Sequence, residues 1–274
     1  MSYKKTVIVL FLAIVCTQTY AQKADTAAMI SDFNKVMGFA TQPYLYYSST
    51  TKMEATPILQ MEDTMRVRGE YYKNETNLYS GSAKEEMYME DSFYIEINHS
   101  RKTIWISKVN GETKKKMNEM PLDRKDIQEL LRKSYTISQT EIDKNISKLN
   151  FETVQYTDSI SKIIMQIQLQ YDNKKYLPQA LVMNVYAKQQ IQEEIVQRLK
   201  DQAIDTKQLI QTDGEYIYMI RIQKMTMTFE QIDNSKEKAI QIPSWKSKLY
   251  YDATLNEFTI KDAKYNEYEI TKTY

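Results

Sequence analysis

Residue types that commonly carry catalysis are scarce in this chain of 274 residues. It contains 1 His, 1 Cys and 5 Gly, and no two glycines lie close enough to form a dinucleotide-binding loop or a P-loop. Zinc sites and thiol nucleophiles need clustered His or Cys, so the sequence predicts no metal site and no cofactor. The single histidine, His99, falls in a predicted turn, Asn98–Lys102, and we expect it to be an exposed turn residue rather than a catalytic base.

Three pairs of adjacent carboxylates are the remaining candidates for acid–base chemistry: Glu62-Asp63, Glu85-Glu86 and Glu90-Asp91. Neighbouring residues on a strand point to opposite faces of the sheet, so no such pair forms a two-carboxylate site by itself. A carbohydrate-active enzyme built from distant carboxylates stays open as a third hypothesis. The sequence favours a protein that is not an enzyme, with no catalytic residues.

Two rows of apolar side chains are the strongest candidates for a binding site. Along one predicted strand Met165, Ile167 and Leu169 share a face, and along a later one Met225, Met227 and Phe229 do the same. No polar residue interrupts either row, so we expect both to line one apolar interior. Methionine adapts to irregular space and to varied apolar partners, so that interior is either a packed core or a ligand cavity.

The 22 tyrosines also allow two interpretations. Pairs such as Tyr46-Tyr47, Tyr71-Tyr72 and Tyr250-Tyr251 place one ring on each face of a strand. Such rings can line a ligand groove or a protein interface. Ordinary strand residues that shield a sheet explain them equally, and we favour that explanation.

Periodicity predicts the elements that position these rows. Apolar residues recur at helical spacing in Asp25–Met37, which Gly38 follows, and in Leu122–Tyr135 and Gln190–Ala203. Asn110-Gly111 and Asp213-Gly214 predict hairpin turns. Alternating segments predict strands at Tyr44–Ser48, Met65–Tyr72, Phe93–Ile97, Thr103–Val109, Ile163–Gln170, Leu181–Tyr186, Tyr216–Phe229, Phe258–Ile260 and Tyr268–Ile270.

These strands follow one another without regular intervening helices, which disfavours a parallel β-α-β series. The sequence therefore predicts an α+β fold with a curved, mainly antiparallel sheet. A net charge of +1 argues against a general nucleic-acid binder. No segment reaches the ~20 consecutive apolar residues of a transmembrane helix.

The N-terminus has the pattern of a secretory signal peptide. Lys4 and Lys5 precede the apolar run Val7–Cys16, and Thr19-Tyr20-Ala21 supplies small residues for cleavage before Gln22. We expect residues 1–21 to be removed, leaving 22–274 as a single domain with no cysteine and no disulfide. An alternative is a lipid-modified Cys16. The cleavage pattern resembles exported proteins of the Bacteroidetes, which implies a periplasmic or outer-membrane-associated location.

The layout of the chain resembles the outer-membrane lipoprotein carrier (LolA-like) superfamily. An export signal precedes an amphipathic helix and an antiparallel meander, and the step Tyr171-Asp172-Asn173-Lys174-Lys175-Tyr176-Leu177-Pro178 is similar to a strand turn of that family. The resemblance covers residues 25 to about 230, and the remainder forms a C-terminal extension. It implies a half-barrel with helices in or against its concave face, which shelters acyl chains or other apolar ligands.

The sequence thus leads to two main hypotheses for function. The first is a non-catalytic envelope protein that binds a lipid or a lipoprotein acyl chain through the two apolar rows. The second is an envelope structural or protein-interaction module with a packed core, no ligand and a protein partner.

Overall fold

The computed structural model describes residues 26–58, 61–75, 77–111, 133–153, 156–157, 162–207 and 209–273. The predicted signal peptide, Cys16 and the cleavage site before Gln22 lie outside the described residues. So does most of the predicted helix Leu122–Tyr135. Its last residue, Tyr135, begins a strand instead.

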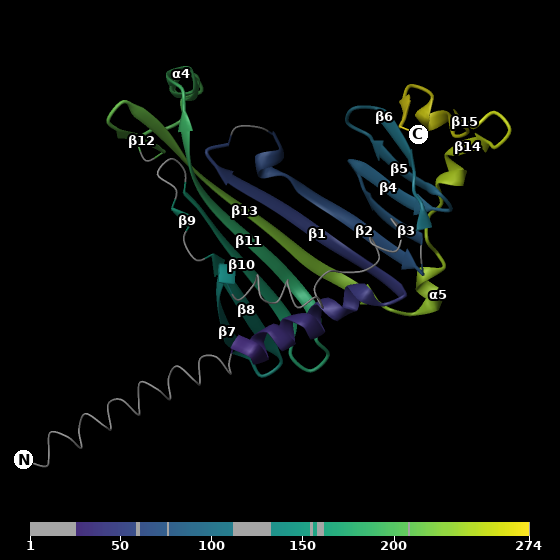
Figure 1. The fold of residues 1–274 in the computed structure, drawn as a ribbon, viewed down its shortest axis with the longest axis horizontal. Coiled ribbons are helices and arrows are strands. Elements are labelled where there is room, and N and C mark those ends of the chain that lie inside the picture. The colour runs from purple at the N-terminus through teal and green to yellow at the C-terminus, as the bar shows by residue number, and fades with distance from the viewer. Residues whose placement is uncertain are drawn as a thin grey trace, which may run out of the picture.

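One large sheet dominates the described part of the chain (Figure 1). It has 14 strands in the spatial order β16-β6-β5-β4-β3-β2-β1-β13-β11-β10-β8-β7, with β12 beside β13 and β9 beside β10. All its pairs are antiparallel except β16 with β6. The strands are β1 Tyr44–Thr56, β2 Arg66–Asn74, β3 Asn77–Ser82, β4 Glu85–Glu90, β5 Phe93–Asn98, β6 Thr103–Lys108, β7 Tyr135–Asp143, β8 Ile146–Thr153, β9 Tyr156–Thr157, β10 Lys162–Asp172, β11 Leu177–Ile191, β12 Ile210–Asp213, β13 Tyr216–Asp233 and β16 Glu269–Lys272.

Short helices and one further hairpin complete the described elements. An N-terminal helix spans residues 26–37. The hairpin of β14 Leu249–Asp252 and β15 Glu257–Ile260 forms a separate two-stranded sheet. The other helices are η1 Gly38–Thr41, η2 Met61–Thr64, α4 Glu193–Asp201, α5 Lys236–Ala239, η4 Trp245–Ser247 and η5 Ala263–Tyr265.

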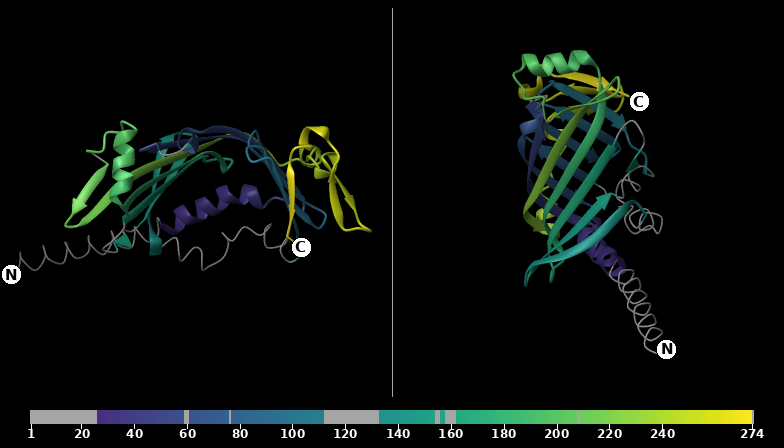
Figure 2. Two further views of the ribbon diagram at one scale, coloured as in Figure 1. Left: turned by 90° about the horizontal axis from the view of Figure 1, so that it is seen from above. Right: turned by 90° about the vertical axis from the view of Figure 1, so that its left-hand side faces the viewer.

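The N-terminal helix packs against one face of the sheet, as its apolar stripe predicts. Val36 is fully buried against Leu149 of β8 and Leu169 of β10. The Phe33 ring meets the Phe151 ring of β8 edge-on, with centroids 5.0 Å apart. We call this side of the sheet the helix face and the opposite side the outer face. Figure 2 shows the helix lying along the helix face.

The other end of the sheet buries its outer face. The register that links β10 to β4 puts Met87 on the helix face and therefore Tyr88 on the outer face. The C-terminal segment packs there, and its Trp245 and Phe258 join Tyr88 in one buried cluster. The two ends of one sheet thus have their cores on opposite faces.

Each predicted strand overlaps an observed one, namely β1, β2, β5, β6, β10, β11, β13, β15 and β16, whereas β3, β4, β7, β8, β9, β12 and β14 were not predicted. The sheet is mainly antiparallel, as predicted, and it is open, because the terminal strands β16 and β7 are not neighbours. In β6, Ile104 and Ile106 are fully buried while Trp105 is 37% exposed, which confirms the predicted alternation. The predicted turn between Tyr171 and Pro178 joins β10 to β11.

Two predictions of local structure are wrong. Asn110-Gly111 does not form a hairpin, because the strand before it, β6, pairs with β5 and β16 instead of with the next described strand, β7. The helix predicted over Gln190–Ala203 begins only at Glu193. Its first predicted turn belongs to β11, which pairs with β13 as far as Ile191, and this pairing overrides the helical spacing.

Candidate ligand-binding site

An apolar cavity lies between the N-terminal helix and the sheet. Its volume is about 410 Å³, within the range of roughly 300–1,000 Å³ typical of small-molecule sites. We call it the helix-side cavity. Its walls come from the N-terminal helix, η1 and five strands: Phe33, Met37, Phe39, Ala40, Leu45, Tyr47, Tyr71, Lys73, Ile167, Leu169, Pro178, Leu181 and Phe229.

Aromatic rings form one wall of this cavity. The Phe229 centroid lies 5.5 Å from that of Tyr47 and 5.8 Å from that of Phe39, both in edge-on geometry. Tyr47 stacks on Tyr71 across the β1–β2 pair, with centroids 5.0 Å apart. Such contacts fix the rings in place, so this wall is held by the sheet rather than by a ligand.

The low polarity of the cavity shifts the pKa values of three groups in its walls. Burial raises the pKa of the Tyr47 hydroxyl. The pKa of Tyr71 is raised first by burial and then by the neighbouring Tyr47. Burial lowers the pKa of the Lys73 ammonium. All three shifts disfavour charge, as expected where water is excluded.

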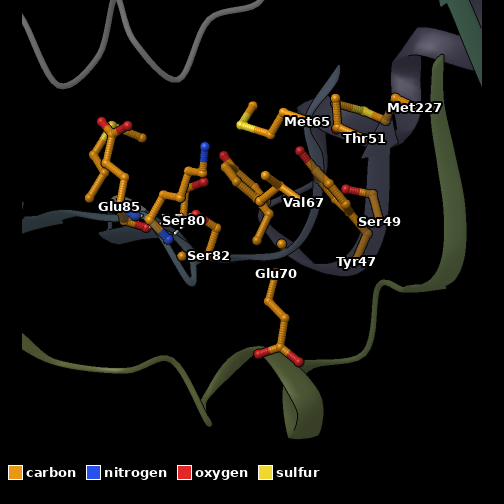
Figure 3. Close-up of a pocket in the computed structure, with 15 residues that line it drawn as sticks. Tyr47, Ser49, Thr51, Met65, Val67, Glu70, Ser80, Ser82, Glu85 and Met227 are labelled. Carbon is orange, nitrogen blue, oxygen red and sulfur yellow. Dashed lines mark hydrogen bonds between the residues drawn. The ribbon is translucent and has the colours of Figure 1, made fainter. Parts of the chain in front are cut away.

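A second hollow, the serine groove, adjoins the cavity on the helix face (Figure 3). Its volume is about 400 Å³, and it shares Tyr47 and Tyr71 with the helix-side cavity. Its remaining lining residues are Ser49, Thr51, Met65, Val67, Gly69, Glu70, Ser80, Gly81, Ser82, Lys84, Glu85, Met87 and Met227. The serines make this hollow more polar than the cavity.

Glycine permits close approach of the strands under the groove. A Cβ on Gly69 would lie 3.3 Å from the carbonyl oxygen of Gly81, which is tight for an ordinary side chain. In Figure 3 the Glu70 side chain points away from the other labelled residues, and it accepts a hydrogen bond from Tyr46 at 3.4 Å. Burial and the neighbouring Glu96 raise the pKa of Glu85, the other carboxyl group of the groove.

Methionines continue the apolar surface away from the helix. Cross-strand pairing places Met183 of β11 beside Met225 of β13, and Met225 beside Met53 of β1. The backbone N–H of Met53 donates to the carbonyl of Met65 at 2.7 Å. All four side chains are half-buried. Flexible thioether side chains at a half-covered surface can adapt to ligands of different shapes.

The structure separates the six residues predicted from the sequence into three groups. Ile167, Leu169 and Phe229 line the helix-side cavity. Met227 lines the serine groove. Met165 and Met225 share the same sheet face by register but line neither hollow. That any of the six binds a ligand stays a prediction.

Several lining residues were not predicted as site residues. Phe33 and Met37 fall in the predicted helix Asp25–Met37, Tyr71 was named with Tyr72 as a pair for which ordinary strand packing was favoured, and Phe39 and Lys73 were not singled out. Lys73 carried a usable signal. It follows Val67, Gly69 and Tyr71 at period two in β2, so its side chain points to the same face as Tyr71.

His99 is not the exposed turn residue that the sequence predicted. It lies between β5 and β6, but its side chain is only 16% exposed because the C-terminal segment covers it. Its Nε2 lies 3.0 Å from Glu86, and its Nδ1 lies 3.0 Å from the Tyr268 hydroxyl. These contacts occupy both ring nitrogens.

The described residues offer neither a metal site nor a membrane-spanning helix. They contain no group of three or more His, Cys, Asp or Glu side chains that could hold a metal ion. Within the same residues no helix is both long and apolar enough to cross a membrane. In comparisons with known proteins, no family model and no curated protein matches this chain.

Proposed function

We propose that the protein is a non-catalytic, exported envelope protein that holds an apolar ligand in the helix-side cavity. One observation carries this proposal: the cavity walls are apolar except for Lys73 and the tyrosine hydroxyls, yet the described residues leave about 410 Å³ between them. Protein cores normally pack to the density of organic crystals. An apolar space of this size gains free energy when a ligand removes its walls from water.

The shape of the sheet fits such a role. In this proposal the sheet forms a half-barrel whose concave side is the helix face, and Figure 2 supports a bend of this kind. The methionine row extends the apolar surface beyond the cavity, so a ligand longer than the cavity still finds apolar contacts. A lipid or a lipoprotein acyl chain has the required length and apolarity, as the resemblance to the outer-membrane lipoprotein carriers implies.

A protein-interaction module is the second candidate, and the edge strand β7 favours it. Seven of its nine residues are exposed. Among the described residues its outer edge pairs with no strand, and an edge of this kind can accept a strand of another chain. In this alternative the cavity is a packing defect and holds nothing.

A tryptophan inside the cavity separates the two candidates. Leu181 points to the helix face and lines the cavity, whereas Val182, the next residue of β11, points to the outer face. We expect Leu181→Trp to weaken binding of the neutral fluorescent probe N-phenyl-1-naphthylamine by about tenfold or more, because the indole fills the space. Val182→Trp, the matched control, should bind the probe like wild type.

Melting curves of both variants show whether they fold. Wild-type protein that binds no probe, or a folded Leu181→Trp variant that binds it unchanged, would contradict the cavity proposal. The first of these results would leave the interaction module as the better explanation.

A further inference from the structure

Lys73 is an unusual residue for the wall of an apolar cavity. Its residue surface is only 4% exposed, although lysine normally keeps its ammonium group in water. On the neighbouring strands it lies between Leu45 and Leu78, which are 0% and 8% exposed. The charged head is therefore buried with the stem.

The ammonium group has little to compensate for this burial. Within the described part of the chain, its one hydrogen bond is to the backbone carbonyl of Ala40 in η1, at 3.5 Å, beyond the usual range of roughly 2.7–3.2 Å. Among the described residues no carboxylate forms an ion pair with Lys73, and no acidic side chain lines the helix-side cavity. An ammonium carries three donors, so the described residues leave the Lys73 head group short of acceptors.

An unpaired buried charge is one of the least favourable features a fold can contain. A ligand that supplies an anion at this point removes the penalty, and charge-assisted hydrogen bonds of the ammonium–carboxylate type are among the strongest in proteins. Apart from the tyrosine hydroxyls, the remaining walls are apolar. The two observations together describe a molecule with one charged end and one apolar end.

We propose that the ligand of the helix-side cavity is an anionic amphiphile, whose apolar chain fills the cavity and whose single carboxylate pairs with the Lys73 ammonium. This inference rests on the proposed function and adds the chemical class of the ligand. A fatty-acid-type anion satisfies it, because one ammonium balances one carboxylate. A fatty alcohol of equal length satisfies only the apolar walls.

The test compares dodecanoate with dodecan-1-ol, each as a competitor that displaces N-phenyl-1-naphthylamine from the full-length chain. Wild type should bind dodecanoate about tenfold or more tightly than the alcohol. Lys73→Met keeps the length of the side chain without its charge, and the preference should fall to about one. Lys73→Arg keeps the charge and should retain the preference, as should the control Lys224→Met, whose lysine is exposed on the outer face. Acetate, which has no chain, should displace nothing.

Melting curves provide a readout that does not depend on the ligand. Lys73→Met should fold and melt at or above the wild-type temperature, because it removes an unpaired buried charge. Equal affinities of wild type for dodecanoate and dodecan-1-ol would overturn the anionic inference and leave the apolar cavity intact. If Lys73→Met still prefers dodecanoate to dodecan-1-ol, the anionic inference is overturned as well. Failure of both competitors to bind wild type would reject the proposed function as well.

Discussion

A buried glutamate fastens the C-terminal segment to the sheet, and its replacement should undock that segment. Glu86 of β4 is 8% exposed and points to the outer face. It accepts hydrogen bonds from Tyr88 and, at 3.1 Å, from Tyr265. Lys248 and His99 approach it at 3.2 and 3.0 Å. Tyr265 and Lys248 belong to the C-terminal segment, and His99 lies in the turn between β5 and β6. Three of the four partners therefore come from outside β4.

Glu86→Gln changes this hydrogen-bond network while keeping the size of the side chain. In the parent, Oε1 contacts Tyr265 and His99, and Oε2 contacts Tyr88 and Lys248. The single amide oxygen can replace only one of these two acceptors, and the amide nitrogen cannot accept from the other pair of partners. Removing one partner of a buried ion pair costs about 3–5 kcal/mol. Lys248 and His99 keep 19% and 16% of their side chains exposed and can regain some hydration. We therefore expect a loss of about 2–4 kcal/mol in the free energy that docks the C-terminal segment.

Tryptophan fluorescence can follow this docking directly. Trp245 is buried against Phe93 and Phe258, and the chain has only 2 tryptophans. In a Trp105→Phe background Trp245 is the sole reporter, and urea unfolding should begin at lower urea in the Glu86→Gln variant. Glu257→Gln, at an exposed position of β15, is the control and should match the parent. A Glu86→Gln loss below about 0.5 kcal/mol would refute the reasoning, since that is the range of ordinary surface substitutions.

The same residue gives the docking a defined pH dependence. Burial alone would raise the pKa of Glu86, but the hydrogen bonds from Tyr88 and Tyr265 and the charge of Lys248 outweigh it and lower the pKa below its ordinary 4.5. A carboxyl group with a lowered folded-state pKa stabilises the fold above its unfolded pKa and loses that contribution as the pH falls through the folded value. The parent should therefore lose docking free energy in acid. Glu86→Gln should lose less over the same range.

Two further predictions concern the packing and one turn. Leu149 is fully buried beneath the N-terminal helix, so Leu149→Ala should lower the free energy of unfolding by about 2–5 kcal/mol in urea titrations. A change no larger than that of a surface substitution would show that the helix does not pack there. Gly214→Ala should lower the free energy of unfolding by about 1–2 kcal/mol, because Gly214 has a φ of +59°, a conformation that strains any residue with a Cβ. The added Cβ meets no neighbouring atom, so the backbone strain is the only cost. An unchanged melting temperature would contradict the left-handed conformation of this turn residue.

Local pattern predicted strands in which apolar and polar residues alternate regularly, but it missed others, such as β7, whose residues are mostly exposed. Phe93, Ile95 and Ile97 alternate with half-exposed residues in β5 as the sequence indicates. Pattern could not predict that β16 pairs with β6, or that β1 pairs with β13 from the far part of the chain. Such pairings depend on contacts between distant segments, on which period-two alternation carries no information.

In the candidate site, too, local pattern predicted the faces of single strands but not which strands are neighbours. The alternation in β10 and β13 correctly placed Leu169 and Met227 each within an apolar row. These strands do not touch, because β11 lies between them and its Leu181 pairs with both residues. The sequence therefore predicted the chemistry of the surface but not its extent. The cavity is confined to the end near the helix, and helix residues such as Phe33 complete it.

Among the described residues, the length of the N-terminal helix limits how much of the helix face is covered. Residues 26–37 make a helix about 18 Å long at a rise of roughly 1.5 Å per residue. Neighbouring strands are about 4.8 Å apart, so such a helix covers roughly four strands. The C-terminal segment does not extend this cover, because it packs on the outer face. Among the described residues, the middle of the helix face therefore keeps an apolar surface with no element long enough to close it. In our proposal, a chain-like ligand anchored at Lys73 supplies the missing cover.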